Sequence, residues 1–290
     1  MGLRTEWWNI AYRCKDDKTF RVIKNGYKGW YADPFLFEFM DETYLFAEYF
    51  SFSLQRGVIV CAKYDEKKQR FSAFRKCIVE DFHMSYPVVF RYNDKIYLMP
   101  ETSGEKALFL YEAVSFPFEW KRLPAVMTNI RLADTTPIEI GDKLYAVSLK
   151  IREEGKVPGD LILLEYNNGT FEISPLGVLT EDMSIARPGG NFIVRDNKLY
   201  RVSQDCATGY GNAVNILELS SDFPKGFREE LKHKITPHNV HIDIKEVPSG
   251  IHTYNINDRV EVIDLKFYRN SFYNLIWKAI YKIKRFKWTQ

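Results

Sequence analysis

The segment WYADPFLF at residues 30–37 decides the fold, because four related segments follow it along the chain. These are MSYPVVF at 84–90, ADTTPIEI at 133–140, IARPGGNFIV at 185–194 and SGIHTYNI at 249–256. The prolines recur at steps of 53, 50 and 51 residues, and the last step, from Arg187 to Gly250, is 63. Recurrence at a period of this size is typical of repeat architectures.

Each repeat contains further apolar runs that are separated by polar turns. Short runs rich in Val, Ile, Tyr and Phe predict strands joined by hairpins, and the clearest turn is NNG at 167–169. With a fourth, weaker run in each unit, the sequence predicts an all-β fold, a five-bladed β-propeller with four-stranded blades. A β-sandwich with coincidental spacing is the alternative. The N-terminal run WWNIAYR should add a strand to the last blade, because an open sheet leaves unpaired edges.

The repeats predict one propeller domain over residues 1–265 and a separate C-terminal segment over 266–290. The net charge of the whole chain is +3, but residues 265–290 contain seven Lys and Arg residues and no acid, so the ring is mildly acidic. Apolar residues recur in this segment at helical spacing beside a basic stripe, which predicts an amphipathic helix; they are Phe272, Ile276, Ala279, Ile280 and Ile283.

We expect residues 271–287 to lie on an anionic membrane surface. The alternative is that the apolar face of this helix packs on the ring. Nucleic acid is not an expected partner, since the rest of the chain offers no basic groove.

The cysteines and the N-terminus indicate the compartment. Cys14, Cys61, Cys77 and Cys206 form no C-x-x-C pair and no metal-ligand spacing, which predicts reduced thiols. The N-terminus lacks the apolar core of a signal peptide. These features predict a cytoplasmic protein that is peripheral at the inner face of the membrane.

The repeated segments should bring unlike polar groups together. In a propeller the first strand of each blade lines the central channel, so we expect convergence at one mouth of Asp33, Ser85 or Tyr86, Asp134, Arg187 and His252. Such convergence is typical of a binding site. We expect Asp33 to line the channel without a core role; burial in a salt bridge between blades would count against catalysis by this residue.

The ADPF motif at 32–35 and the five-fold count resemble the five-bladed glycoside hydrolases of families 43 and 32. The resemblance implies that Asp33 is a general base and that Asp134 tunes its pKa. Where those enzymes carry a glutamate acid this chain has Arg187, and arginine cannot donate a proton at neutral pH. The resemblance also implies that His252 could hold a water or a metal ion on the axis, with a hydrogen-bonded structural histidine as the alternative.

A closer resemblance covers most of the chain. The segments YLMPETSGEKALFLYEAVSFPFEW at 97–120, QDCATGYGNAVNILEL at 204–219 and GIHTYN at 250–255, with ADTTPIEI and ARPGG, are similar to the propeller domain named after glucosamine inositolphosphorylceramide transferase. Related bacterial proteins of this family belong to surface-polysaccharide pathways. The resemblance implies sugar-related work.

Two glutamates occupy the same repeat position, since Glu48 and Glu101 are 53 residues apart. A carboxylate on an apolar strand is costly unless it is paired or used, so each could replace the missing acid or could bond a neighbouring blade. Asp205 has a similar place in the fourth blade, where pairing with a loop amide is the alternative, and Tyr210 should shape the mouth. The predicted catalytic residues are Asp33, Asp134 and Glu101, and the predicted substrate-binding residues are Arg187, His252, Ser85, Glu48, Asp205 and Tyr210.

These observations favour a sugar-transfer enzyme of bacterial surface-polysaccharide or glycolipid synthesis, acting at the membrane on a sugar or nucleotide-sugar substrate. The fork of Arg187 would pair with a phosphate. The alternatives are a family-43-like glycosidase that uses Glu101 or Glu48 as its acid, and a non-catalytic glycan-binding or scaffold propeller.

Overall fold

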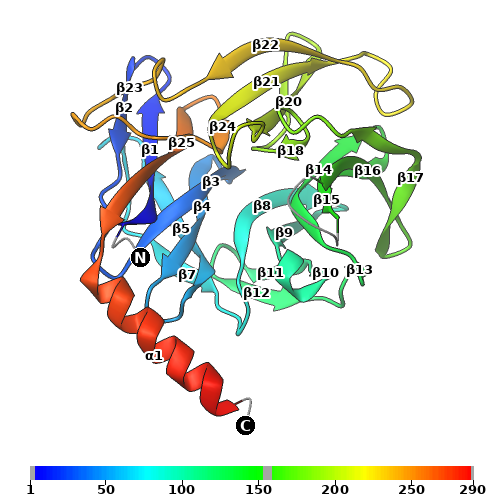
Figure 1. Ribbon diagram of the computed structural model, residues 1–290. Coiled ribbons are helices and arrows are strands. Elements are labelled where there is room, and N and C mark those ends of the chain that lie inside the picture. The colour runs from blue at the N-terminus through cyan, green and yellow to red at the C-terminus, as the bar shows by residue number, and fades with distance from the viewer. Residues whose placement is uncertain (1–3, 153–158, 289–290) are drawn as a thin grey trace.

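The computed structural model describes residues 4–152 and 159–288, with side chains described as far as residue 283. Five sheets, antiparallel except for one short parallel pair in the last, are arranged in a ring around a central axis, and one α-helix follows them (Figure 1). This confirms the five-bladed β-propeller.

Four blades are continuous in sequence. The first contains β3 (Gly29–Phe39), β4 (Glu42–Ser51), β5 (Arg56–Asp65), β6 (Arg70–Phe71) and β7 (Arg75–Ile78). The second contains β8 (Ser85–Tyr92), β9 (Lys95–Glu101), β11 (Tyr111–Ser115) and β12 (Glu119–Arg122). The third contains β14 (Leu132–Ile140), β15 (Lys143–Ile151), β16 (Gly159–Asn167) and β17 (Thr170–Thr180). The fourth contains β18 (Arg187–Pro188), β19 (Ile193–Arg195), β20 (Lys198–Asp205), β21 (Ala213–Leu219) and β22 (Glu229–Ile235).

Only short elements lie outside these sheets. A small ladder pairs β10 (Ala107–Leu108) with β13 (Met127–Thr128), and a 3-10 turn, η1, covers Ser103–Glu105. The predicted hairpin turn is confirmed, because β16 ends at Asn167 and β17 begins at Thr170, with positive φ at Asn168 and Gly169.

The fifth blade joins the two ends of the chain. It contains β24 (Tyr254–Ile256), β25 (Val260–Asn270), β1 (Arg4–Cys14) and β2 (Thr19–Val22), with β23 (His241–Ile242) at its outer edge. Strand β1 pairs with β25 along its whole length, from Arg4 opposite Asn270 to Cys14 opposite Val260. The blue and orange strands therefore lie side by side in Figure 1. The prediction that WWNIAYR closes the ring is confirmed.

The repeated segments form β-bulges on the inner strands. Asp33, Tyr86 and Asp134 each adopt a left-handed backbone, with φ of 50°, 47° and 55°, where the register of β3, β8 and β14 shifts. Non-glycine residues in this conformation are uncommon and cluster at functional sites. The bulge residues Asp33, Tyr86 and Asp134 are therefore the structurally equivalent positions of the three blades. Pro137 lies three residues after its bulge residue, whereas Pro34 follows its own directly, so the proline spacing misaligns the third blade by two residues.

The centre of the ring is filled by the side chain of Tyr86, which is fully buried. Its hydroxyl lies 2.9 Å from Thr136 Oγ1 of the third blade and donates to the Gly190 carbonyl of the fourth at 3.4 Å. Its ring packs edge-on against Phe35 of the first blade. One side chain thus connects four blades at the axis.

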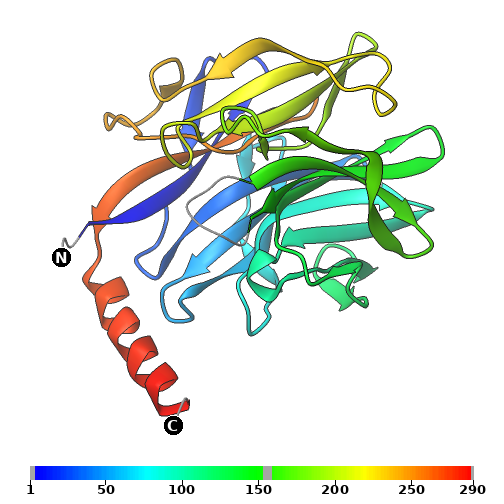
Figure 2. The ribbon, with the colours of Figure 1, turned by 45° about the vertical axis from the view of Figure 1, so that its right-hand side comes forward.

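The helix α1 (Phe272–Trp288) begins where β25 ends, on the face of the ring where β1 and β3 begin (Figures 1 and 2). One side of it packs on the ring, since Tyr273 meets Phe52 and Gln55 donates to the Asn274 side chain. Its apolar stripe faces outward, with Phe272 74% and Ile276 59% exposed. This confirms the amphipathic helix and contradicts the alternative in which the ring covers that stripe.

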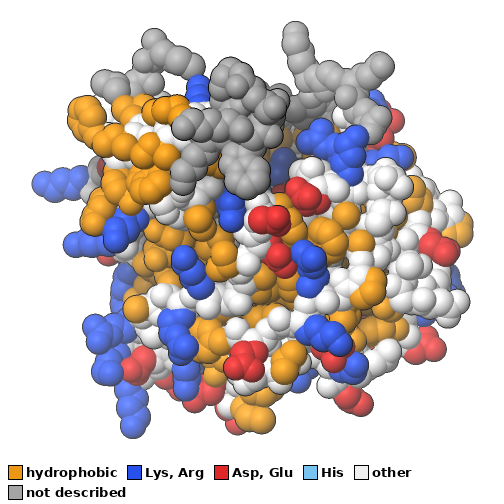
Figure 3. Space-filling view, turned by 90° about the horizontal axis from the view of Figure 1, so that it is seen from below, with side chains coloured by type: hydrophobic (Ala, Val, Ile, Leu, Met, Phe, Trp, Pro, Cys, Tyr) orange, Lys and Arg blue, Asp and Glu red, His pale blue; other side chains and the backbone are white. Residues whose placement is uncertain are grey.

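The lower side of the molecule is seen in Figure 3. There a group of hydrophobic side chains at the upper left lies close to Lys and Arg side chains. No helix in the described part of the chain is long and apolar enough to cross a bilayer. All four cysteines are free thiols in the structure, with Cys14 and Cys61 buried and Cys77 and Cys206 half-buried.

Candidate functional site

A cavity of about 360 Å³ opens at the centre of the ring. Its lining comes from the beginnings of β1, β3 and β8, the ends of β4 and β9, and the repeated segments of the other blades, so its mouth lies on the face where α1 begins. The structure brings eight of the nine predicted site residues to it: Asp33, Glu48, Ser85, Glu101, Asp134, Arg187, Tyr210 and His252. Their placement is as expected, and their roles stay predictions.

Asp33 lies where three blades meet. Its Oδ2 accepts a hydrogen bond from the backbone N–H of Tyr86 at 3.0 Å, and its Oδ1 accepts one from the Thr253 hydroxyl at 2.9 Å. His252 Nε2 faces Oδ1 at 3.3 Å. These contacts contradict the expectation that Asp33 has no core role, because they join the first blade to the second and the fifth. A pairing of this kind counts against a general base, so we do not carry that role into the proposed function.

His252 is held between two carboxylates. Its Nδ1 lies 2.5 Å from Asp264 Oδ2, while its Nε2 faces Asp33. The oxygens of Asp264 also accept the backbone N–H groups of Asp33, His252 and Thr253. The imidazole stacks on Trp8 with ring centroids 4.0 Å apart.

Burial and the charges of neighbouring groups shift the pKa values of Asp33 and His252. Burial raises the pKa of Asp33 to about 6, although the charge of His252 lowers it. Burial alone would lower the pKa of His252, but Asp264 and Asp33 raise it. The cluster therefore favours a charged imidazole beside carboxylates.

In the described part of the chain, Asp33, His252 and Asp264 are the one group whose ligand atoms lie close enough together, within 4.8 Å, to suggest a metal site. Both nitrogens of His252 already face carboxylates, and four donors occupy Asp264. A metal ion would have to replace these contacts. The geometry fits a hydrogen-bonded structural histidine better than an axial metal ligand.

Asp134, which is buried, pairs with Arg187, which is half-buried. Arg187 Nε lies 2.6 Å from Asp134 Oδ2, which also accepts from the Gln204 amide at 2.8 Å. Burial raises the pKa of Asp134, and Arg187 opposes that rise. Arg187 makes no further side-chain hydrogen bond within residues 4–152 and 159–288, and its guanidinium lies over the Tyr210 ring. Its terminal nitrogens are therefore placed to bind an anionic group.

Glu101 is fixed by two donors. Its Oε2 accepts from the Ser85 hydroxyl at 3.2 Å, and its Oε1 accepts from the backbone N–H of Ser103 at 2.9 Å. Each oxygen retains room for another donor. This arrangement leaves the carboxyl group of Glu101 placed to receive a substrate hydroxyl.

Glu48 Oε1 is buried without a hydrogen-bond partner among the residues that the structure describes. The Glu48 side chain is 5% exposed, and His83 Nε2 lies 3.8 Å from Glu48 Oε1. Burial raises the pKa of Glu48 well above its ordinary value. A neutral carboxylic acid is the form that this environment favours.

Asp205 lies outside the cavity, which is a correction to the predicted substrate-binding set. Its Oδ2 pairs with Lys234 at 2.6 Å, and its Oδ1 accepts from the backbone N–H of Ala207. Pairing with a loop amide was the alternative, and the structure supports it. The preceding Gln204 reaches inward instead.

Several cavity residues were not predicted. Aromatic rings form part of the wall. Trp30 stacks on Phe50 with ring centroids 4.9 Å apart, and Trp8 meets Tyr210 edge-on. Glu6 also lines the cavity and pairs with Lys266. Trp30 belongs to the first repeated segment but was not predicted to line the cavity, whereas Glu6 and Trp8 reach it through the closure of the ring by β1. Flat apolar rings beside polar groups suit a sugar, whose faces are apolar and whose edge carries hydroxyls.

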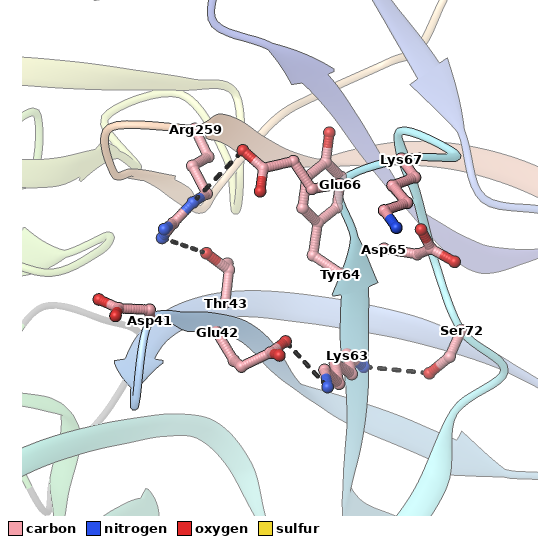
Figure 4. Close-up of a pocket in the computed structure, with 10 residues that line it drawn as sticks. All are labelled: Asp41, Glu42, Thr43, Lys63, Tyr64, Asp65, Glu66, Lys67, Ser72 and Arg259. Carbon is pink, nitrogen blue, oxygen red and sulfur yellow. Dashed lines mark hydrogen bonds and ion pairs between the residues drawn. The ribbon is translucent and has the colours of Figure 1, made fainter.

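A larger groove of about 440 Å³ lies on the opposite face, between the first and fifth blades (Figure 4). Several of its charged side chains pair with one another, as Lys63 does with Glu42 and Arg259 with Glu66. None of its side-chain oxygens or nitrogens is buried without a partner. The central cavity is therefore the better candidate site.

The comparisons with known proteins identify the family and the fold of the chain. Residues 19–265 match the family model described as glucosamine inositolphosphorylceramide transferase 1, N-terminal. A protein of that name from Oryza sativa subsp. indica is 31% identical over 234 residues, which are 77% of this chain and 30% of the relative. The Arabidopsis thaliana protein is 31% identical over 241 residues, 76% of this chain and 31% of the relative. The chain thus spans about a third of the length of these relatives.

Solved structures with the same fold include glycoside hydrolases. A family 117 glycoside hydrolase from Zobellia galactanivorans aligns with a TM-score of 0.58 and 11% identity, covering 91% of each chain. An α-L-arabinofuranosidase from Lactobacillus brevis aligns with a TM-score of 0.55 and 14% identity, covering 81% of this chain and 82% of that one. At these identities the likeness shows the fold alone.

Proposed function

Because this chain belongs to the family described as glucosamine inositolphosphorylceramide transferase 1, N-terminal, we propose that its central cavity binds a sugar for glycosyl transfer in glycolipid or surface-polysaccharide synthesis. The observation that carries the proposal is the cavity itself. Carboxyl groups from neighbouring blades, one arginine and stacked aromatic rings face the same space.

In this proposal Glu101 receives the acceptor hydroxyl. The Ser85 hydroxyl and the Ser103 N–H hold the carboxylate in one orientation, so an acceptor would meet a base that is already positioned. Asp134 keeps Arg187 in place, and the terminal nitrogens of Arg187 bind a phosphoryl group of the substrate.

The helix α1 would bring this cavity to a membrane. The mouth and the helix share one face of the ring, and the apolar stripe of the helix is exposed beside Lys278 and Lys282. A basic amphipathic helix binds anionic bilayers through both kinds of side chain. We therefore propose a cytoplasmic protein, peripheral at the inner face of the membrane, that acts on a lipid-linked acceptor.

Calorimetric titration tests sugar binding. The panel is glucosamine, N-acetylglucosamine, glucose and arabinose, with uridine diphosphate alone and linked to N-acetylglucosamine. We expect at least one sugar to bind, and we expect Arg187→Met to weaken the phosphorylated ligand at least tenfold more than the free sugar. Arg195→Met is the control, because Arg195 is exposed and does not line the cavity. Absence of binding by every member of the panel would disprove the proposal.

The alternative functions are separated by the product. Transfer of labelled sugar to a glycolipid acceptor supports the transferase, whereas release of free sugar in the presence of that acceptor supports a glycosidase. Binding without either product supports a glycan-binding propeller that serves another transferase. The shared fold with glycoside hydrolases is the observation that keeps the second candidate.

A further inference from the structure

Five carboxyl groups line the cavity, from Glu6, Asp33, Glu48, Glu101 and Asp134, and four of them have partners. Glu48 is the exception, since its Oε1 is buried with no hydrogen-bond partner in the described part of the chain. A buried carboxyl without a partner is costly and calls for an explanation.

The neighbouring strand leaves space for this group. Gly57 on β5 lies beside it, and a Cβ at that position would stand 2.4 Å from Glu48 Oε1 and 2.3 Å from the Met84 carbonyl. Any other residue would collide with the backbone carbonyl. The glycine thus allows Glu48 to sit deep in the wall while its carboxyl faces the cavity.

Gly57 also fixes the tautomer of His83. Its backbone N–H donates to His83 Nδ1 at 2.8 Å, so that nitrogen must be unprotonated. The ring proton is then on Nε2, which faces Glu48 Oε1 at 3.8 Å. This distance is too long for a hydrogen bond. It can shorten when Glu48 becomes charged, because an N–H bonds a carboxylate more strongly than a neutral acid.

The charges around Glu48 support the neutral form. After burial, the largest influences on its pKa are Asp33, Glu101, Asp264 and Asp134, and all four raise it. Desolvation lowers the pKa of His83, while Glu101 acts in the opposite direction. These influences favour the uncharged acid at Glu48 and the uncharged imidazole at His83.

We propose that Glu48 is the proton donor of the cavity and that His83 is its positioning residue. The proposal rests on the proposed transfer function and identifies the acid that Arg187 cannot supply. As the bond between the anomeric carbon and the leaving-group oxygen breaks, its electron pair stays on that oxygen, which takes the Glu48 proton. The acceptor oxygen forms the new bond to the anomeric carbon, and its proton passes to Glu101. The Nε2–H of His83 then donates to the Glu48 carboxylate.

Titration of the protein labelled with ¹³C at the glutamate carboxyl carbon tests the state of Glu48 directly. We expect one resonance to titrate above all others and to be absent from Glu48→Gln. Glu105 and Glu119, which are exposed, provide internal references. A Glu48 resonance that titrates with these two would overturn the proposal, whether or not any sugar binds.

Leaving groups of different basicity test the donor role. Methyl and 4-nitrophenyl glucosaminides are the probes, each with a glycolipid acceptor. Glu48→Gln should lower kcat about 10²- to 10⁴-fold for the methyl donor, which needs a proton. It should lower kcat much less for the nitrophenyl donor, with KM little changed. Equal losses on both donors, or full activity of the variant, would overturn this proposal alone, whereas no turnover by the wild type would overturn the proposed transfer function.

The positioning role of His83 has its own readout. His83→Ala removes the donor to the Glu48 carboxylate, so the basic limb of the kcat profile should move to higher pH. His83→Gln keeps an N–H group in reach and should restore the limb. The same two variants should shift the Glu48 resonance in parallel. An unchanged limb in His83→Ala would show that His83 is only structural.

Discussion

Arg187 Nε lies 2.6 Å from Asp134 Oδ2, and this pair joins the fourth blade to the third at the cavity. The carboxylate raises the pKa of Arg187 despite its burial, so the guanidinium is charged at every accessible pH. The position of Arg187 therefore carries a fixed positive charge with a dedicated counter-ion, which suits the binding of an anion and cannot donate a proton at neutral pH.

Arg187→Met should destabilise the protein. Removal of one partner of a buried ion pair costs about 3–5 kcal/mol, because the other charge is left uncompensated. We expect a loss toward the lower end of that range, because Asp134 is buried but Arg187 is 22% exposed. The loss should be smaller at acidic pH, where the unpaired Asp134 can take a proton, and Asp134→Asn should recover part of it in the double variant. Urea unfolding at pH 5 and pH 8 measures these differences.

The matched control is Arg195→Met. Arg195 and its partner Asp196 are 79% and 86% exposed, so their pairing should contribute less than about 1 kcal/mol. If the two arginine variants unfold at the same urea concentration, the pair between Arg187 and Asp134 contributes no more to stability than the exposed pair.

The sequence repeats made much of the fold and part of the site predictable. Asp33, Asp134 and Arg187 could be predicted because each belongs to a repeated segment, and such segments converge on the axis of a ring. Trp8 could not, because it reaches the cavity through the pairing of β1 with β25, more than 250 residues away. The position of His83 against Glu48 depends on how the loop before β8 meets β5, and no spacing records it.

The stability of the ring should fall as pH rises from about 4 to about 6. Asp33 has a pKa of about 6 in the folded protein, above its ordinary value of 3.8, so the folded state holds the proton more tightly than the unfolded chain. Its contribution is full at low pH and is lost as the pH rises, by about 1.4 kcal/mol per unit over that interval. The raised pKa of His252 extends the decline above 6.5.

Asp33→Asn should flatten this decline between pH 4 and 6. Denaturant unfolding at unit steps of pH compares it with the wild type and with Asp65→Asn. Asp65 is the control because its pKa is shifted the other way, by its bonds to Lys68. Parallel curves for the wild type and Asp33→Asn would contradict the assignment of the shift to Asp33.

Closure of the ring should depend on β1 and not on α1. Strand β1 supplies the third strand of the fifth blade, and without it β25 would be an open edge. We expect a chain that lacks residues 1–14 to lose cooperative thermal unfolding. A chain that lacks residues 272–290 should keep a melting temperature within a few degrees of the full chain. Equal melting of the two truncated chains would show that the closing strand does not stabilise the ring.

The exposed stripe of α1 should hold the ring on anionic membranes. Each Lys or Arg near such a surface contributes about 1 kcal/mol to binding, and burial of the apolar side chains in the interface contributes further.

The triple variant Phe272→Asn, Ile276→Asn, Ile283→Asn removes exposed apolar groups of the helix only. The matched control replaces Met40, Val114 and Val194, which are as exposed but lie on the ring strands and their turns. We expect the wild type and the control to sediment with vesicles that contain phosphatidylserine, and the helix variant to stay in the supernatant. The attraction should weaken with salt, since screening shortens the reach of charge from about 8 Å at physiological ionic strength to about 3 Å at 1 M. Sedimentation of all three proteins to the same extent would remove the membrane role and leave α1 as an appendage of the ring.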